Sequence, residues 1–156
     1  MALSPNKFNL TVQAMARGGA SGTGLLLNAD TLKLGLCTAA AAPVATDTTF
    51  PGTATQVSNG NGYTTGGVSL TGATSNSSGT ETLKTTANFA SPTWTASTSG
   101  FSLRYLIWYD STSTLGPCQN LLWYDYGSTL ALSGANGDTF DVSGSNFNTT
   151  GWATLA

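Results

Sequence analysis

Short strand-like segments recur along most of this sequence, and turn-forming residues separate them. Such residues stand at 77–79, 99–100, 127 and 136–137, ending at Gly79, Gly100, Gly127 and Gly137, where they supply the tight or positive-φ positions that hairpins require. Many short strands without intervening helices are typical of an antiparallel sandwich or barrel. We therefore predict a mainly β fold, an antiparallel β-sandwich of jelly-roll-like or Ig-like type with one short N-terminal helix. The expected strands lie near residues 67–74, 80–89, 93–97, 101–109, 120–126, 129–133, 138–143 and 151–155.

Two of these segments are nearly identical, Leu106-Ile-Trp-Tyr-Asp110 and Leu121-Leu-Trp-Tyr-Asp125. Each has apolar side chains on both faces, which is typical of a strand that is covered on both sides. We expect them to be neighbouring strands of one sheet, with Asp110 opposite about Asn120 and Asp125 opposite about Tyr105. The two carboxylates would then stand roughly 17 Å apart along the strands, too far for the carboxyl pair of a glycosidase. Turn capping or solvent exposure is the role expected for each.

The N-terminal region carries a helix signal. Ser4 can cap a helix and Pro5 fits the first helical position, while Gly18-Gly19 ends the pattern, so we predict a helix over residues 5–17. Its apolar face either packs on the body of the domain or docks on a neighbouring subunit. The second interpretation gives three candidate interface residues, Phe8, Val12 and Met15.

The whole chain, residues 1–156, is expected to form a single β domain, with residues 1–30 as an N-terminal helix or arm. After Thr31, Leu32, Leu34 and Leu36 alternate with Lys33 and Gly35. This alternation predicts a strand whose polar half, Lys33 and Gly35, faces water. Residues 39–62 are rich in breakers and lack periodicity, so a long irregular surface connection is expected there.

Composition excludes several classes of partner. Thr, Ser and Gly account for 27, 17 and 19 residues, whereas charged residues make up only 8 % of the chain, against about 25 % in typical domains. The exterior should therefore be rich in hydroxyl groups and nearly uncharged. A net charge of −2 offers none of the clustered Lys and Arg that nucleic-acid grooves and anionic membranes require. Neither partner is expected.

Location and cysteine chemistry are linked. The first residues lack a basic segment followed by an apolar run, and no stretch approaches the ~18 apolar residues of a membrane span. Synthesis and residence in a cytoplasm are therefore expected. Cys37 and Cys118 show no metal or redox spacing. They form either one bridge or two buried thiols, and the reducing compartment favours two thiols.

Catalytic motifs are largely missing. The chain has no histidine, which excludes Ser–His and Cys–His nucleophilic sites and imidazole metal sites. A Ser–Lys site stays formally open, although Lys7, Lys33 and Lys84 stand in no nucleophile motif. The stretch 136–141 lacks the alternating acidic residues and distal Glu of a calcium loop, so a hairpin turn is expected there. We predict no enzyme activity, no metal and no cofactor.

The aromatic residues leave two interpretations open. An exposed sugar-stacking platform would make the chain a carbohydrate-binding module, whereas burial of the same rings would supply a β-sandwich core. Core packing is the favoured interpretation. The aromatics concerned are Trp94, Tyr105, Trp108, Trp123, Tyr124, Tyr126 and Trp152.

Several segments together resemble small virion structural proteins of tailed bacteriophages, and the resemblance spans most of the chain. It implies a particle component, commonly a capsid decoration or cement protein seated as a trimer on the major capsid protein, or else a neck or tail fibre component. The implied setting is the virion, with host cytoplasm during assembly, and the implied partners are other virion proteins and further copies of this chain. The segments are Ser4-Pro-Asn-Lys-Phe-Asn9, Leu32-Lys-Leu34, Asn61-Gly-Tyr-Thr-Thr-Gly-Gly67, Thr93-Trp-Thr-Ala-Ser97, Trp123-Tyr-Asp-Tyr-Gly127 and Gly137-Asp-Thr-Phe140.

Overall fold

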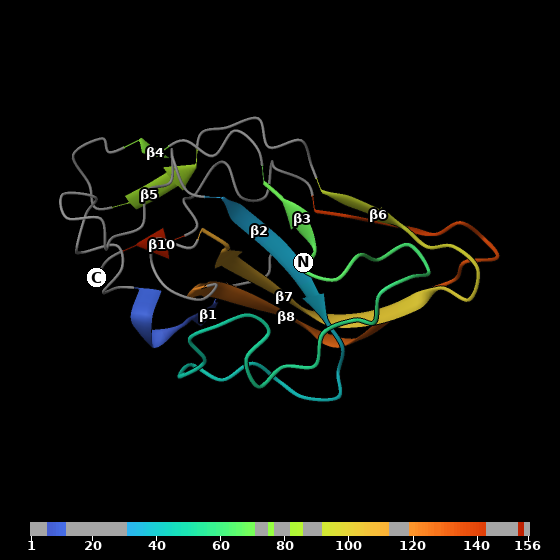
Figure 1. The fold of residues 1–156 in the computed structure, drawn as a ribbon, viewed down its shortest axis with the longest axis horizontal. Coiled ribbons are helices and arrows are strands. Elements are labelled where there is room, and N and C mark those ends of the chain that lie inside the picture. Colours follow the sequence, from blue (N-terminus) through green and yellow to red (C-terminus); the bar gives the residue numbers. More distant parts are fainter. Residues whose placement is uncertain are drawn as a thin grey trace.

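The fold is mainly β and antiparallel, with one short helical stretch at residues 9–11, as predicted. The computed structural model describes residues 6–11, 31–70, 75–76, 82–85, 92–112, 119–142 and 153–154. Five strands form the main sheet in the order β1-β8-β7-β2-β3, and two smaller sheets have the orders β10-β5-β4 and β6-β9 (Figure 1). The strands are β1 (Asn6–Lys7), β2 (Leu32–Cys37), β3 (Val68–Ser69), β4 (Ser75–Asn76), β5 (Thr82–Thr85), β6 (Thr93–Thr95), β7 (Phe101–Asp110), β8 (Gln119–Leu132), β9 (Thr139–Asp141) and β10 (Ala153–Thr154).

Both faces of the main sheet are buried. On one face the leucines of β2 join Trp108 of β7 in a core that includes Trp94 of β6 and Phe140 of β9. On the other face Ile107 of β7 packs with Phe8 and other buried side chains. The layer described opposite the first face is the β6–β9 ribbon together with loop residues rather than a second broad sheet, so the jelly-roll or Ig-like sandwich stays a prediction.

The twin segments are the central strands β7 and β8, which pair antiparallel as predicted. Trp108 lies opposite Leu122 and Tyr109 opposite Asn120, so Leu121 is an extra residue on β8. This bulge explains how the successive residues Leu121 and Leu122 both belong to the first core cluster, because an extra residue breaks the strict alternation of side chains between faces.

The turn predicted at Gly127 is wrong. β8 runs unbroken from Gln119 to Leu132, where two strands, 120–126 and 129–133, had been expected. Gly127 has a φ of 78° and lies in an irregular stretch where β7 advances by two residues and β8 by five. A positive-φ glycine satisfies a bulge as well as a turn, so the residue type alone does not separate them. The turns at Gly100 and Gly137, with φ of 72° and 63°, are confirmed, and the one predicted at residues 77–79 lies outside the described residues.

The prediction that one half of the strand after Thr31 faces water is also wrong. Of the two residues expected to face water, Lys33 is half-buried and Gly35 is buried. The reason is that the connection after β2 folds back over this face: a Cβ at Gly35 would stand 2.3 Å from Cζ of Phe50. The Phe50 ring itself stacks on Tyr109 at a centroid distance of 4.3 Å.

Residues 39–62 contain no named strand, in line with the irregular connection predicted there. Hydrogen bonds nevertheless tie its second half to the edge of β2, because Val57 N–H donates to the Leu36 carbonyl. Directly after the connection, the Tyr63 hydroxyl accepts a hydrogen bond from Leu36 N–H. Ala54 and Val57 are buried. These two side chains therefore join the core, while most of the connection lies at the surface, as predicted.

The helix begins later than predicted. Asn6 and Lys7 form β1 and pair with Trp123 and Leu122 of β8, and helical backbone begins only at Asn9. The edge of β8 offers backbone partners to an extended segment, and this competes with the helix start at Pro5. Residues 12–17, the rest of the predicted helix, lie outside the described residues.

Candidate interaction surfaces

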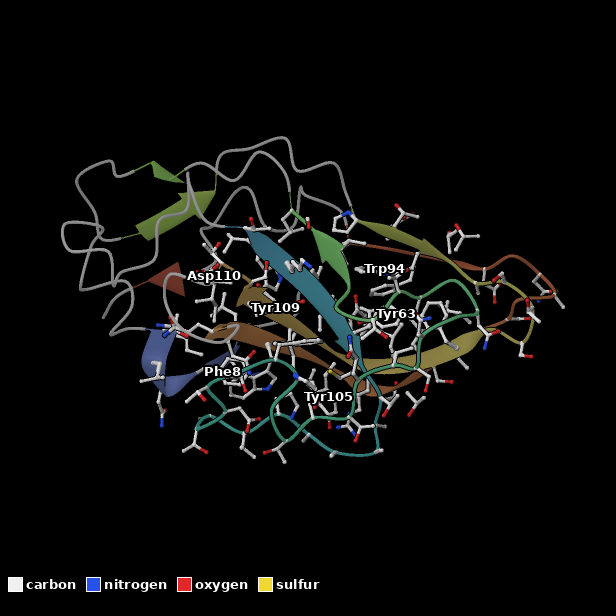
Figure 2. All side chains as sticks on the ribbon, in the orientation of Figure 1. Phe8, Tyr63, Trp94, Tyr105, Tyr109 and Asp110 are labelled. Atoms are coloured by element: carbon white, nitrogen blue, oxygen red, sulfur yellow. The ribbon has the colours of Figure 1, made fainter. Side chains whose placement is uncertain are left out.

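The twin aspartates form no catalytic pair. Asp110 lies opposite Gln119 and Asp125 opposite Tyr105, within one residue of the predicted register. Five residues of β7 therefore separate the two positions, or roughly 17 Å. Asp110 is the last residue of β7, is completely buried, and lies far from Trp94 of β6 (Figure 2). Its Oδ1 accepts a hydrogen bond of 2.8 Å from Thr112 N–H. The capping role is confirmed for Asp110, whereas solvent exposure is wrong.

Asp125 is held by a bidentate ion pair. Arg104 Nε and Nη2 donate to its two carboxylate oxygens at 2.8 and 3.0 Å, and Gly127 N–H donates to Oδ1 at 2.7 Å. The guanidinium also lies 5.1 Å from the ring centroid of Tyr105. The Arg104 hydrogen bonds lower the pKa of Asp125, so this carboxylate is ionised at neutral pH and caps the β8 bulge. With both side chains about a third exposed, such a pair contributes at most about 1 kcal/mol.

The other described carboxylates serve turns and strand pairs as well. Asp47, Asp138 and Asp141 each accept hydrogen bonds from nearby groups of the chain. The donors are Val44 N–H and the Thr53 hydroxyl for Asp47, Ser133 N–H for Asp138, and the Thr93 hydroxyl for Asp141. All five described carboxylates are therefore used to fix backbone or side chains, and no group of three metal-ligating side chains occurs in the described part of the chain.

The described surface carries very little charge. Among the eight Lys, Arg and Asp residues whose side-chain burial is described, only Lys7 and Asp141 are exposed. The others are half-buried or buried. The expectation of a nearly uncharged exterior agrees with this part of the chain.

The aromatic residues pack inside the protein. Trp94 and Trp108 are 3 % and 2 % exposed, and Tyr63 lies in the same core cluster as Trp94 of β6 (Figure 2). Trp123 is half-buried and its ring lies 4.5 Å from that of Phe8. Core packing, the favoured interpretation, is what these rings show, and Trp152 lies outside the described residues.

The three candidate interface residues have different outcomes. Phe8 is 1 % exposed and lies in the core beside the N-terminal turn (Figure 2). It therefore packs on the body of its own domain. Val12 and Met15 lie outside the described residues.

Cys37 is a free thiol in this structure, and burial raises its pKa to about 12. At neutral pH it is protonated and unreactive. Cys118 lies outside the described residues.

Two exposed features do stand out. Val44 is the one exposed large apolar side chain among the described residues, at 42 %, and the Asp47 turn holds it in place. The second feature is the outer edge of β8 from Tyr126 to Leu132, which pairs with no described strand. The sequence pattern did not reveal this edge because Gly127 was expected to form a turn. The uncharged run of residues 126–133 was the available signal.

Known proteins give no independent indication of family or function. No family model, no curated protein and no solved structure matches this chain. Within the described residues, no helix is long and apolar enough to cross a membrane.

Proposed function

We propose that this chain is a structural protein of a tailed-bacteriophage particle and acts as a capsid decoration protein that binds the major capsid protein. The observation that carries the proposal is that the charged groups serve the fold. Every described carboxylate accepts a hydrogen bond from within the chain, and only two of the charged side chains whose burial is described are exposed. A protein of this kind works by contact area rather than by a reaction.

The sequence resemblance supplies the setting. Three of the resembling segments also have clear structural roles: Tyr63 anchors the connection, Trp94 fills the core, and Asp125 with Gly127 forms the capped bulge. In this proposal the chain is not an enzyme, forms homo-oligomers, with a trimer favoured, and binds neither nucleic acid nor membrane. It resides in the virion after assembly in the host cytoplasm.

A particle contact works through repetition. A specific stable contact needs upwards of about 1,000 Å² of buried surface, and many copies convert modest contacts into strong avidity. A nearly neutral surface supports dense packing because neighbouring copies repel one another weakly.

Quantitative mass spectrometry of purified particles tests the proposal. Hundreds of copies per particle, with labelling on the shell, are expected for a decoration protein. A dozen or fewer copies would assign the chain to the neck or tail instead. Its absence from the particle would refute the virion setting altogether.

A further inference from the structure

The open edge of β8 is the feature that points furthest beyond the proposed function. β8 pairs with β7 from Gln119 to Asp125 and again from Leu130 to Leu132, whereas β1 covers its other side only at Leu122 and Trp123. In Figure 1 the β7–β8 pair continues past the end of β2 toward β6. Along residues 126–132 the outer side of the strand has no described neighbour, so it presents backbone groups to which another strand can bond.

The backbone direction along this edge follows from one close contact. A Cβ at Gly100 would stand 1.9 Å from the Leu132 carbonyl oxygen, so Leu132 directs its backbone groups toward β7. Successive residues of a strand alternate in this respect. Ala131 and Thr129 therefore direct their N–H and C=O groups away from β7, and both residues are exposed.

The edge lacks the features that normally prevent strand addition. Natural edges are blunted by Lys, Pro or inward-pointing charge, yet residues 126–133 read Tyr-Gly-Ser-Thr-Leu-Ala-Leu-Ser, with no charge and no proline. The side chains of Thr129 and Ala131 are small enough to admit a second strand. The bulge at Gly127 limits the open edge at one end, and the hydrogen bonds between Ser133 and Asp138 limit it at the other.

We propose that the β8 edge binds the β8 edge of a second copy of this chain, antiparallel and about a twofold axis. In the register that the backbone groups allow, Thr129 lies opposite Ala131 of the other copy, which gives four inter-chain hydrogen bonds. Leu130, which is half-buried in the single chain, lies opposite Leu130 of the second copy and becomes more buried in the dimer. A shifted register would need the backbone groups of Ser133. This register is disfavoured because the N–H and C=O of Ser133 already bond to Asp138.

A second copy fits this edge better than a charged partner. Identical uncharged edges do not repel, and a twofold contact requires only that one surface be complementary to itself. Since one strand pair buries little area, the isolated dimer is weak and its population depends on concentration. This twofold contact is separate from the contacts of the proposed trimer. It concerns the purified chain and holds or fails independently of the virion setting.

Sedimentation equilibrium of the full chain tests the contact, from about 1 μM to about 1 mM, the range of weak association. Ala131→Pro removes the outward N–H, a change that edge strands tolerate, and Ala131→Lys adds a charge to the edge. Ala131→Ser is the matched control because it keeps the N–H and the small size. The dissociation constant should rise at least about tenfold in the first two variants and stay unchanged in the control.

Hydrogen exchange supplies a residue-level measurement. With rising concentration, exchange should slow at the amides of Thr129 and Ala131, whereas Leu132, bonded to β7, should not change. A wild-type chain that stays monomeric at about 1 mM overturns the inference. The inference is also overturned if Ala131→Lys leaves the dissociation constant unchanged while its near-ultraviolet circular dichroism shows native packing. Ala131→Lys is the deciding variant if Ala131→Pro fails to fold.

Discussion

The hydroxyl group of Tyr63 is predicted to stabilise the fold by about 2 kcal/mol, and Tyr63→Phe tests this. The side chain is 2 % exposed, and its oxygen accepts hydrogen bonds from Leu36 N–H at 3.1 Å and Gln56 Nε2 at 2.9 Å. Leu36 lies on the edge of β2 beyond the end of β3, so the hydroxyl takes the place of a missing strand. A buried N–H left without a partner costs about 1–3 kcal/mol, while the half-buried Gln56 can turn to water.

For a domain of this length, each kcal/mol shifts the melting temperature by roughly 2–4 °C. Tyr63→Phe should therefore lower it by roughly 4–8 °C, with urea unfolding followed by tryptophan fluorescence giving the free energy. Tyr126→Phe is the matched control because no hydrogen bond of its hydroxyl is found among the described residues, and it should change stability by less than about 0.5 kcal/mol. Equal stability of the two variants would refute the reasoning.

Three further predictions concern single contacts. Gly35→Ala drives a Cβ into the Phe50 ring and should cost about 1–3 kcal/mol in urea unfolding; an unchanged midpoint would contradict the contact. Because Arg104 lowers the pKa of folded Asp125, their pair stabilises above the ordinary carboxyl range and is lost as pH falls through the lowered value. Asp125→Asn should therefore cost up to about 1 kcal/mol at neutral pH and less in acid, and equal loss at both pH values would count against the pair. With its pKa raised to about 12, Cys37 should react with iodoacetamide at least about 100-fold faster in urea than in native protein, as peptide mass spectrometry can measure; fast native labelling would be inconsistent with its burial.

Residue patterns predicted the central strands well. The twin segments gave both the neighbouring strands β7 and β8 and their register to within one residue, because apolar side chains on both faces identify a strand that is covered on both sides. Local alternation, however, misplaced the burial of Gly35, which was expected to face water. The cover on that face comes from the distant Phe50 and its neighbours, and no local pattern encodes a loop that folds back.

The candidate site was harder to predict, for a physical reason. Gly127 fits a bulge or a turn equally well, and the choice depends on the pairing with β7. Asn6 and Lys7 are extended because the edge of β8 is available at Trp123 and Leu122. β8 has an open edge because the strand continues through Gly127 and because β1 covers it only at Leu122 and Trp123. Both features depend on tertiary pairing, so the sequence alone does not reveal the edge.

The placement of charge and the open edge support one view of how this protein associates. Long-range attraction requires exposed charge, and among the side chains whose burial is described only Lys7 and Asp141 are exposed. Arg104 and Asp125 are about a third exposed and are paired with each other. Neutral partners meet without steering, at roughly 10⁵–10⁶ M⁻¹s⁻¹, so strong association must come from slow dissociation. Backbone hydrogen bonds along an edge, repeated over many copies, slow dissociation without any charged contact. A chain with so few ionisable groups is therefore better suited to a fixed place in an assembly than to rapid exchange between partners.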